Sequence, residues 1–480
     1  MKKLWILFSV LVSGACWYLS FDLSGNFWYL LWLAPVPVLL VSFRASAGIS
    51  FVVAFLSFLI GRLSWVPYLL SVLPLLLAIV FTVLFPIIFA VVVILTRKLV
   101  LKQTSWSVFA FPALWCFFEF LMFKFSRDGT AGSIAYSEAN FLPVIQIASV
   151  TGIIGVSFLV TLFPSAVALV IHRRYGRKLP LLLALIIVVA SLSFGMIRVK
   201  KDRIDKKSIT VGLAVVDEKF HSETDQPKAE DVIRLATIYA GQIAQLAQKG
   251  VQVIVLPEKM INIKDGFGDS ARNMLQQAAK VNHVTVVAGY TQFTDGKSYH
   301  NNAWVISAEG HFLANYQKVN LFEGEAMSGF VGGDTISAFD LLNMPSGVAI
   351  CKDMDYDGFM RVYAVQKAQV LYVPAWDFIR DGWLHSRMAI VRGVENGYAI
   401  VRTARQGRLT VSDYRGKVLY EASCENNKAA SLVGKVDVVS TRTIYSRFGD
   451  WFEYLIVLSC CYFLVIFFRK DPYRSKNNKA

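Results

Sequence analysis

The segment Gly347-Val-Ala-Ile-Cys351-Lys-Asp353 decides what kind of fold surrounds it. Its first four residues are small or apolar, which predicts a buried strand, and a thiol flanked by charged groups follows directly. Sheets in α/β proteins usually place their chemistry at the carboxyl ends of strands. Asp353, two residues beyond the thiol, can orient or tune such a site. A lone cysteine is nevertheless more often a buried core residue than a nucleophile. The segment points to chemistry only if other reactive groups follow neighbouring strands.

Two other predicted strands of the same region are followed by charged side chains. The strand predicted at 251–256 is followed by Glu258, and the strand predicted at 303–306 and its turn are followed by Lys318. A thiol attacks a carbonyl group as the thiolate, so it needs a base, and the oxyanion that forms needs a cation. Glu258 can be the base, Lys318 the cation and Cys351 the nucleophile. Spacing alone favours a simpler interpretation, in which a surface lysine and a capping glutamate lie near a buried cysteine.

Composition predicts a membrane protein with one folded domain outside the bilayer. Hydrophobic residues make up 55% of the 480 residues and charged residues only 17%, which is too apolar for an ordinary soluble protein. The long apolar runs lie within 4–197 and 451–468, whereas 200–450 has the composition of a soluble domain. A domain of roughly 240 residues is long enough for a single α/β core.

Apolar runs of about 18 residues or more predict eight membrane-spanning helices, seven before the domain and one after it. We expect them at 4–21, 26–43, 47–62, 70–96, 105–123, 148–171, 179–197 and 451–468. The predicted organisation is a transmembrane domain at 1–200, a catalytic domain at 205–445, a final transmembrane helix at 450–469 and a basic tail at 470–480.

Loop charges predict how these helices are oriented. If the amino terminus is cytoplasmic, fifteen basic residues lie in inside segments and only Arg62, Lys124 and Arg127 lie in the short outside loops. The inside residues are Lys2, Lys3, Arg44, Arg97, Lys98, Lys102, Arg173, Arg174, Arg177, Lys178 and the five that follow Phe468. The rule places 200–450 on the periplasmic or outer side and both termini in the cytoplasm. The basic run 200–207 disagrees with the rule, but it begins a large translocated domain.

Composition also argues against several classes of function. The net charge of +15 lies largely in short loops beside apolar segments, which is what membrane topology requires, so we expect no binding of nucleic acid. Four of the six cysteines fall in apolar spans, and Cys351 and Cys424 form no CxxC pair. The six histidines show no ligand spacing, so no metal is predicted.

The domain at 200–450 alternates predicted strands and helices. Strands are expected at 209–215, 251–256, 284–288, 303–306, 347–350, 370–373, 399–403 and 407–412, and helices at 228–248, 269–281, 358–367 and 383–396. This alternation, with an antiparallel pair at the end, predicts a mixed α/β sandwich.

Several motifs resemble those of the nitrilase, or carbon–nitrogen hydrolase, superfamily. Leu256-Pro-Glu258, Tyr316-Gln-Lys318 and Ile350-Cys351 are similar to the segments that carry its Glu-Lys-Cys triad. The run Arg387-Met-Ala-Ile-Val-Arg-Gly-Val-Glu-Asn-Gly-Tyr-Ala-Ile-Val-Arg-Thr403 resembles its late helix-then-strand segment. The resemblance covers about residues 209–440 and implies an α-β-β-α sandwich.

Such a domain, with seven spans before it and one after it, resembles the apolipoprotein N-acyltransferase family. The segments 132–137 and 152–158 are similar to that family's membrane region. The resemblance implies that the cysteine takes an acyl chain from a membrane phospholipid as a thioester. It then passes the chain to the α-amino group of the diacylglyceryl-cysteine at a lipoprotein's amino terminus. Glu258 would be the general base, Lys318 the oxyanion stabiliser and Cys351 the nucleophile, in a bacterial inner membrane and without a cofactor.

Further residues receive candidate roles from the same resemblance. Glu325 roughly matches a family glutamate, and Asp353 stands where the family often has a glutamate. Large apolar residues near the triad can form a mobile lid over the acyl chain, although ordinary packing explains each of them equally well. They are Phe322, Met327, Phe330, Trp376, Phe378 and Trp383.

Two loops depart from the family pattern and leave the acyl acceptor open. They are Leu321-Phe-Glu-Gly-Glu325, which is one residue shorter, and Pro374-Ala-Trp-Asp377. One alternative is therefore a membrane-tethered nitrilase-type amidase, in which water resolves the thioester, or an acyltransferase with a different amine acceptor. A non-enzyme alternative is a membrane protein whose outer domain binds or transports a ligand.

Overall fold

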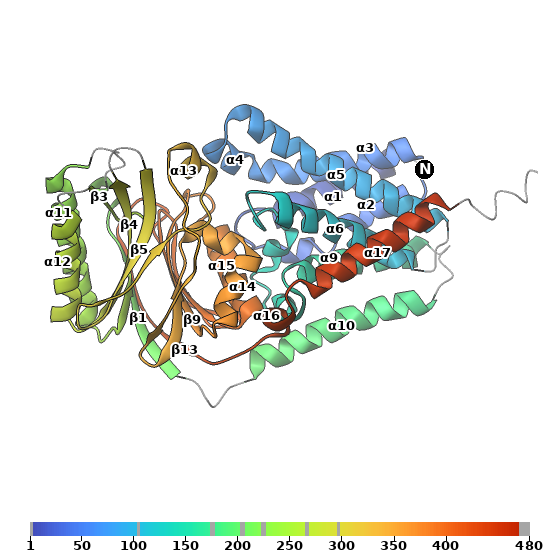
Figure 1. Cartoon of the computed structure of the whole chain (residues 1–480). Helices are drawn as coiled ribbons and strands as arrows, with labels where there is room; N and C mark the ends of the chain where they lie inside the picture. The colour runs from blue at the N-terminus through green and yellow to red at the C-terminus, as the bar shows by residue number, and fades with distance from the viewer. Residues whose placement is uncertain are drawn as a thin grey trace, which may run out of the picture. The chain divides into compact units, whose positions relative to one another are not determined.

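A computed structural model of the protein describes residues 3–102, 106–172, 178–201, 207–221, 227–264, 268–294 and 298–469. The chain forms two compact units (Figure 1). The helical unit comprises Met1–Ser126, Gly132–Lys200 and Asp450–Ala480, and the α/β unit comprises Arg127–Ala131 and Lys201–Gly449. The predicted basic tail at 470–480 lies outside the described residues.

The helical unit contains, within the described residues, seven helical stretches that are long and apolar enough to cross a membrane. They are α1 (Lys3–Ser20), Ala47–Val72 with α3 (Ala47–Arg62), η2 (Leu63–Trp65) and α4 (Val66–Val72), α5 (Leu75–Leu101), Ser107–Phe125 with η3 (Ser107–Phe109) and α6 (Ala110–Phe125), α9 (Ile154–His172), α10 (Lys178–Lys200) and α17 (Trp451–Phe468). Shorter helices are η1 (Trp28–Leu30), α2 (Pro35–Ser42), η4 (Ile134–Glu138), α7 (Leu142–Ile145) and α8 (Ala148–Thr151). Large apolar side chains remain exposed along the long helices, for example Leu76 at 73%, as a lipid environment requires.

The stretch predicted as a span at 26–43 differs from the others. It forms η1 and α2, separated by a turn at residues 31–34, rather than one long helix. Pro35 occupies the beginning of α2, where the missing N–H of proline does no harm. Six long apolar stretches precede the α/β unit and one follows it. The eight predicted spans and these seven stretches therefore differ at 26–43.

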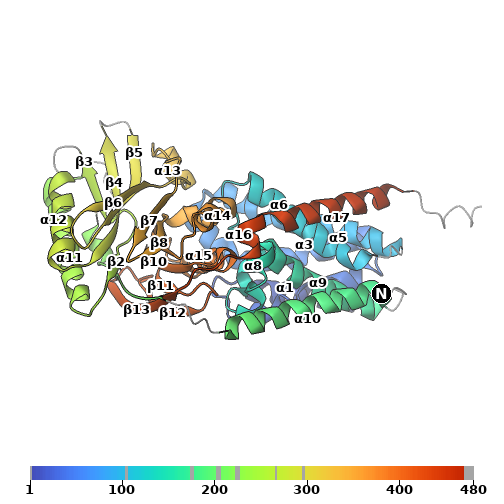
Figure 2. The same cartoon turned by 60° about the horizontal axis from the view of Figure 1, so that its bottom comes forward.

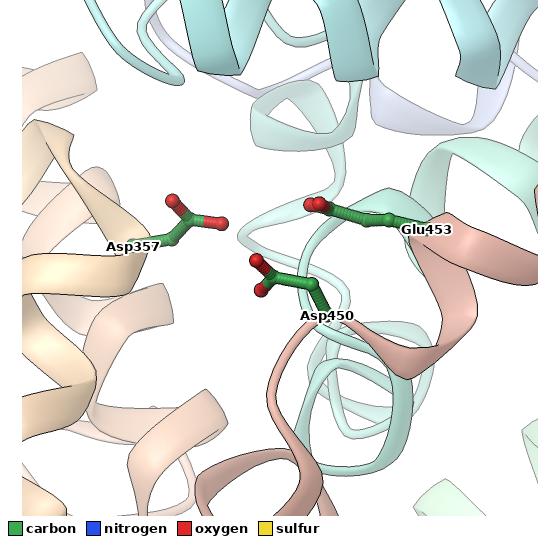
Figure 3. Close-up of side chains that lie close together, drawn as sticks. All are labelled: Asp357, Asp450 and Glu453. Atoms are coloured by element: carbon green, nitrogen blue, oxygen red, sulfur yellow. The ribbon is translucent and has the colours of Figure 1, made fainter. Parts of the chain in front are cut away.

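Aromatic packing and a group of ion pairs hold the helical unit together. The rings of Trp17, Phe58 and Phe89 lie within 4.7–5.5 Å of one another, centre to centre, and join α1, α3 and α5. Lys124 near the end of α6 lies 2.8 Å from Asp450 and 3.1 Å from Glu453 at the beginning of α17. Figure 3 labels both carboxylates.

The α/β unit is built on two sheets. The first has the order β13-β1-β2-β4-β5-β6, with β3 paired to β4, and the second has the order β12-β11-β10-β9-β8-β7. Their strands are β1 (Lys207–Val215), β2 (Val253–Val255), β3 (Ile261–Lys264), β4 (Thr285–Thr294), β5 (Ser298–Ile306), β6 (Phe312–Gln317), β7 (Ser337–Leu341), β8 (Met344–Val348), β9 (Val370–Trp376), β10 (Ala399–Arg405), β11 (Arg408–Ser412), β12 (Val418–Ser423) and β13 (Ala430–Val438).

Helices cover the outer faces of both sheets. Helices α11 (Ala229–Ala247) and α12 (Gly268–Val281) pack on the first sheet, and α14 (Asp357–Val365) and α15 (Gly382–Asn396) pack on the second (Figures 1 and 2). The remaining helical segments are η5 (Glu218–Phe220), α13 (Glu323–Met327), η6 (Cys351–Asp355) and α16 (Ile444–Phe448). This arrangement confirms the predicted α-β-β-α sandwich.

Side-chain alternation along the strands fills three apolar layers. In β2, Val253 and Val255 point into the core between the sheets, whereas Ile254 points toward α11 and α12. Strands β1, β2 and β4 are mutually parallel, as are β8, β9 and β10. Because β5 is antiparallel to both β4 and β6, β6 runs parallel to β2. The segments that follow β2 and β6 therefore leave the same edge of the first sheet.

Candidate active site

The three residues predicted to carry the chemistry all follow strands. Glu258 lies three residues beyond β2, Lys318 directly follows β6, and Cys351 begins η6 shortly after β8. The sequence prediction placed Lys318 after a turn, but the strand β6 extends to its neighbour. Glu258 and Lys318 are each only 2% exposed, so both charges are buried. Burial of charges is costly unless they are paired, which makes the pairing of these side chains decisive.

Lys318 lies between two carboxylates. Its Nζ donates to Oε1 of Glu258 and to Oε2 of Glu325, each at 2.8 Å. Burial alone would lower the pKa of Lys318, but the negative charges of Glu258 and Glu325 outweigh it and hold that pKa well above its usual value. Lys318 is therefore a permanent cation, and Glu325, the predicted supporting residue, is a direct partner of the central lysine.

Asn301 and Lys259 complete this network, and sequence reasoning missed both. The side-chain amide of Asn301 in β5 donates to Oε1 of Glu258 at 2.6 Å and to Oε1 of Glu325 at 2.7 Å. Lys259 Nζ lies 2.7 Å from Oε1 of Glu325. Burial raises the pKa of Glu325, but the charges of Lys318 and Lys259 outweigh it and hold that pKa below its usual range. The only signal for Asn301 in the sequence is a polar pair, Asn301-Asn302, ahead of an apolar run.

Glu258 keeps one oxygen available. Its Oε1 accepts from both Lys318 and Asn301, whereas its buried Oε2 has no hydrogen-bond partner among the described residues. Buried carboxylate oxygens are normally satisfied, so Oε2 of Glu258 has room for one further hydrogen-bond donor. A carboxylate that is held through Oε1 and free at Oε2 can take a proton from a neighbouring acid.

Cys351 lies at a sharp turn of the backbone. Its φ of 44° is in the left-handed region that non-glycine residues rarely adopt, and such strain concentrates at functional sites. Its Sγ lies 3.5 Å from the carbonyl oxygen of Trp376, at the end of β9. Burial raises the pKa of the thiol, as does the charge of Glu258, whereas Lys318 lowers it, and the pKa lies well above its usual value. The thiol is therefore neutral at rest and depends on a base.

Asp353 holds the cysteine turn in place. Its Oδ2 accepts from the hydroxyl of Tyr316 at 2.6 Å and from the backbone N–H of Ile350 at 2.9 Å. Its Oδ1 accepts from the backbone N–H of Asn320 at 2.8 Å. Burial raises the pKa of Asp353, although these hydrogen bonds oppose the shift. The carboxylate thus links the segment after β6, which carries Lys318, to the turn of the second sheet that carries the thiol.

The segment Arg127–Ala131 supports the same turn from the other side. Thr130 donates twice to the carbonyl oxygen of Asp355, from its backbone at 3.0 Å and from its hydroxyl at 2.8 Å. Asp128 lies 2.9 Å from Nζ of Lys352, the residue after the thiol. Nothing in the sequence marks this short segment as part of the α/β unit, because its contacts join residues more than 200 positions apart.

The predicted lid residues fall into different environments. Phe322 and Phe330 are partly buried, and Phe322 lies 5.3 Å from the ring of Phe378, the additional aromatic candidate. Met327 is 81% exposed on α13, the same short helix that carries Glu325. The last two candidates differ from each other in burial. Trp376 is partly buried at the end of β9, next to the thiol, whereas Trp383 is buried at the beginning of α15. Met327 is the candidate most available to a lipid chain.

Comparison with known proteins matches both units of the chain. A model of the carbon–nitrogen hydrolases matches residues 225–443, and a model of the apolipoprotein N-acyltransferase N-terminal domain matches residues 13–166. An apolipoprotein N-acyltransferase from Geobacter metallireducens is 25% identical, over 96% of this chain and 94% of that protein. Another from Borreliella burgdorferi is 24% identical over 72% of each chain. A 2-oxoglutaramate amidase from Bacillus subtilis is 28% identical over 31% of this chain and 61% of its own length. The chain is therefore similar to apolipoprotein N-acyltransferases along nearly its whole length, and its α/β unit is similar to the carbon–nitrogen hydrolases.

Proposed function

We propose that this acyltransferase moves a fatty acyl chain from a membrane phospholipid to Cys351 and then to a lipoprotein. The final acceptor is the α-amino group of the S-diacylglyceryl-cysteine at the lipoprotein's amino terminus. Similarity to apolipoprotein N-acyltransferases along nearly the whole chain supports lipoprotein N-acylation in general. The observation that supports the residue roles is that Lys318 lies buried between Glu258 and Glu325. The charges of Glu258 and Lys318 both act on the Cys351 thiol.

In the first step, the Cys351 thiol attacks the ester carbonyl of the lipid while its proton passes to Glu258. Lys318 and the backbone N–H of Lys352 stabilise the oxyanion of the tetrahedral intermediate. Collapse of the intermediate breaks the ester bond, and the leaving lysophospholipid oxygen takes the proton from Glu258. Throughout this step Lys318 stays paired with Glu325, so that it remains a cation even when Glu258 is protonated.

In the second step, the neutral amine of the lipoprotein attacks the thioester carbonyl. The amine loses a proton to Glu258, and the same oxyanion contacts form again. Collapse breaks the carbon–sulfur bond, the leaving sulfur recovers the proton, and an amide is released. Covalent catalysis thus divides one difficult transfer between two lipids into two easier steps. A domain joined at both ends to apolar helices is suited to substrates that stay in the bilayer.

One alternative function is a membrane-tethered amidase, in which water rather than an amine resolves the thioester. The match to the carbon–nitrogen hydrolases and the similarity to a 2-oxoglutaramate amidase favour this alternative. Both functions use the same acyl-enzyme, so they differ only in the second step. The apolar helices favour the acyltransferase, because a small polar amide would not require them.

We further propose that this bacterial membrane protein resides in the inner membrane with its α/β unit on the periplasmic side. The basic residues of the loops support this orientation by the positive-inside rule. The lipoprotein acceptor would then be met on the side to which lipoproteins are exported.

Intact-protein mass spectrometry of the full chain tests the proposal. After incubation with phospholipid vesicles, the wild type should gain the mass of one acyl chain, and hydroxylamine should remove it. Cys351→Ala should show no gain, whereas Cys424→Ala, which changes the other cysteine of the α/β unit, should behave as the wild type. Adding a diacylated lipopeptide should then move the label to the peptide's amino terminus. Release as free fatty acid despite the lipopeptide would support the amidase, and no adduct in any lipid would refute both.

A further inference from the structure

The helical unit contains a buried arginine whose environment differs from that of every other buried arginine among the described residues. Five arginines in those ranges are buried. Four of them have a carboxylate partner, and they are Arg387 with Glu421, Arg392 with Glu395, Arg402 with Asp377 and Arg405 with Glu218. The fifth, Arg62, is 4% exposed and has no carboxylate or other hydrogen-bond acceptor in the described part of the chain.

Arg62 is the last residue of α3, and two aromatic rings flank its guanidinium. The central carbon lies 4.7 Å from the ring centre of Trp65 in η2 and 4.6 Å from that of Phe85 in α5. Its buried Nε has no hydrogen-bond partner in the described ranges. Aromatic faces attract a cation, but they neither neutralise its charge nor accept its five N–H groups.

An unpaired guanidinium in apolar surroundings requires an anion. Ionisable residues in membrane regions are costly and usually mark sites that receive a ligand or a partner. The planar fork of arginine matches the oxygens of phosphate and carboxylate groups. Leu63, next to Arg62, and Leu84, next to Phe85, are 49% and 42% exposed, so apolar surface adjoins the charge. A cation beside exposed apolar surface fits a molecule that has both an anionic group and hydrocarbon chains.

We propose that Arg62 binds the phosphate of a membrane phospholipid, held between Trp65 and Phe85. The acyl chains of the lipid lie along the exposed apolar surface that includes Leu63 and Leu84. The identification of this lipid as the acyl donor rests on the proposed function, whereas binding of the phosphate does not.

Lipid binding by the full-length chain in the Cys351→Ala background tests the site without turnover. Native mass spectrometry in detergent micelles would compare phosphatidylglycerol with a diacylglycerol of the same chains, which lacks the phosphate. Arg62→Gln should weaken phosphatidylglycerol binding about tenfold, the loss of one strong charge-assisted contact, and leave diacylglycerol binding unchanged. Arg62→Lys keeps the charge but loses the planar fork, so its affinity for phosphatidylglycerol should lie between that of the parent and that of Arg62→Gln. Arg44→Gln, which changes an exposed arginine of the same unit, should match the parent.

Three results would overturn the inference. An equal loss of both lipids in Arg62→Gln would assign Arg62 a structural role, and unchanged binding of both would exclude it from lipid recognition. If Arg62→Gln does not fold, the ratio of the two lipids in Arg62→Lys decides the same question. The third result would identify inorganic phosphate, instead of a lipid, as the true ligand. In that case phosphate raises the melting temperature of the parent but not of Arg62→Gln, while phosphatidylglycerol shows no selective binding. If the wild type forms no thioester but the lipid selectivity holds, the proposed function fails and the phosphate site remains.

Discussion

At the scale of single residues, Glu258 acts on Cys351 in two opposite ways. Its charge, together with burial, raises the pKa of the thiol, yet it is also the proposed base. Glu258→Gln should therefore lower the pKa of Cys351 and still slow formation of the acyl-enzyme by about 10²–10⁴-fold, the usual contribution of a general base. The pH dependence of iodoacetamide alkylation measures the first effect, and the rate of acylation measures the second.

The matched control for this change is Glu309→Gln, which alters an exposed glutamate of the same unit and should leave both measurements unchanged. If Glu258→Gln lowered the pKa and also sped up acylation, Glu258 would only suppress the thiolate and another group would be the base.

His385 in α15 predicts how stability depends on pH. Burial lowers its pKa, but Asp381, whose carboxylate lies 3.0 Å away, outweighs this effect with smaller contributions from Asp355 and Asp377, and the pKa rises to about 9. The pKa of His385 in the folded protein is higher than its value of about 6.5 in the unfolded chain. The stabilisation of the fold by the charged His385 is therefore fully present below pH ~6.5 and is lost as the pH rises through about 9. A shift of this size corresponds to about 3 kcal/mol.

Thermal unfolding between pH 6 and 10 checks this expectation. The wild type should lose more stability over this range than His385→Gln, and the difference between the two should close near pH 9 and above. His283→Gln, at an exposed histidine, should follow the wild type. Parallel curves for wild type and His385→Gln would show that the ion pair with Asp381 contributes nothing.

At the scale of elements, the close approach of β4 to the segment after β2 positions Glu258. A Cβ at Gly289 would lie 2.5 Å from the carbonyl oxygen of Pro257 and 2.7 Å from Cα of Glu258, both backbone atoms that cannot rotate away. Gly289→Ala should therefore shift Glu258 and lower the acylation rate by about 10–100-fold, because catalysis is sensitive to displacements of about 1 Å.

The control for Gly289→Ala is a glycine with free space around it. No atom lies within 4 Å of a Cβ built at Gly241 in α11, so Gly241→Ala should keep full activity and raise the free energy of unfolding by about 0.5–1 kcal/mol. Acylation rates and melting temperatures of the two variants separate a local shift from a general loss of stability. Full activity in Gly289→Ala would mean that the segment adapts without moving the carboxylate.

The elements also show what the sequence can and cannot predict. Strand β2 was predicted because it is buried on both faces and appears as a continuous apolar run. The strand expected at 347–350 overlaps β8 only at Gly347 and Val348, because β8 begins at Met344 and contains Pro345 and Ser346. Strand β6 was missed because Phe312 and Leu313 are exposed and its polar residues pair with β5 at the sheet's edge. The same non-local pairing hid Asn301, whose contacts with Glu258 and Glu325 arise only after the strands assemble. The alternation of strands and helices nevertheless predicted the sandwich, and the motifs supplied the three candidate site residues.

At the scale of the whole molecule, the segment 26–43 decides on which side of the membrane the amino terminus lies. If this segment crosses, the amino terminus and the basic tail are both cytoplasmic, as the sequence predicts. If η1 and α2 are too short to cross, the same rule keeps the α/β unit outside and the tail inside, and only Lys2 and Lys3 change sides. The positive-inside rule therefore predicts the same side for the α/β unit whether or not 26–43 crosses the membrane.

Labelling of single introduced cysteines with a membrane-impermeant maleimide in intact cells tests both points, in a background in which all six native cysteines are replaced. Lys428→Cys, at an exposed position of the α/β unit, should label readily from outside. Lys3→Cys should be protected if 26–43 crosses and should label if it does not, and Lys476→Cys in the tail should be protected in either case. Labelling of Lys476→Cys together with protection of Lys428→Cys would reverse the whole orientation. In that case the proposed lipoprotein acceptor could not reach Cys351 after export, and the cytoplasmic amidase alternative would become the better explanation of the same buried network.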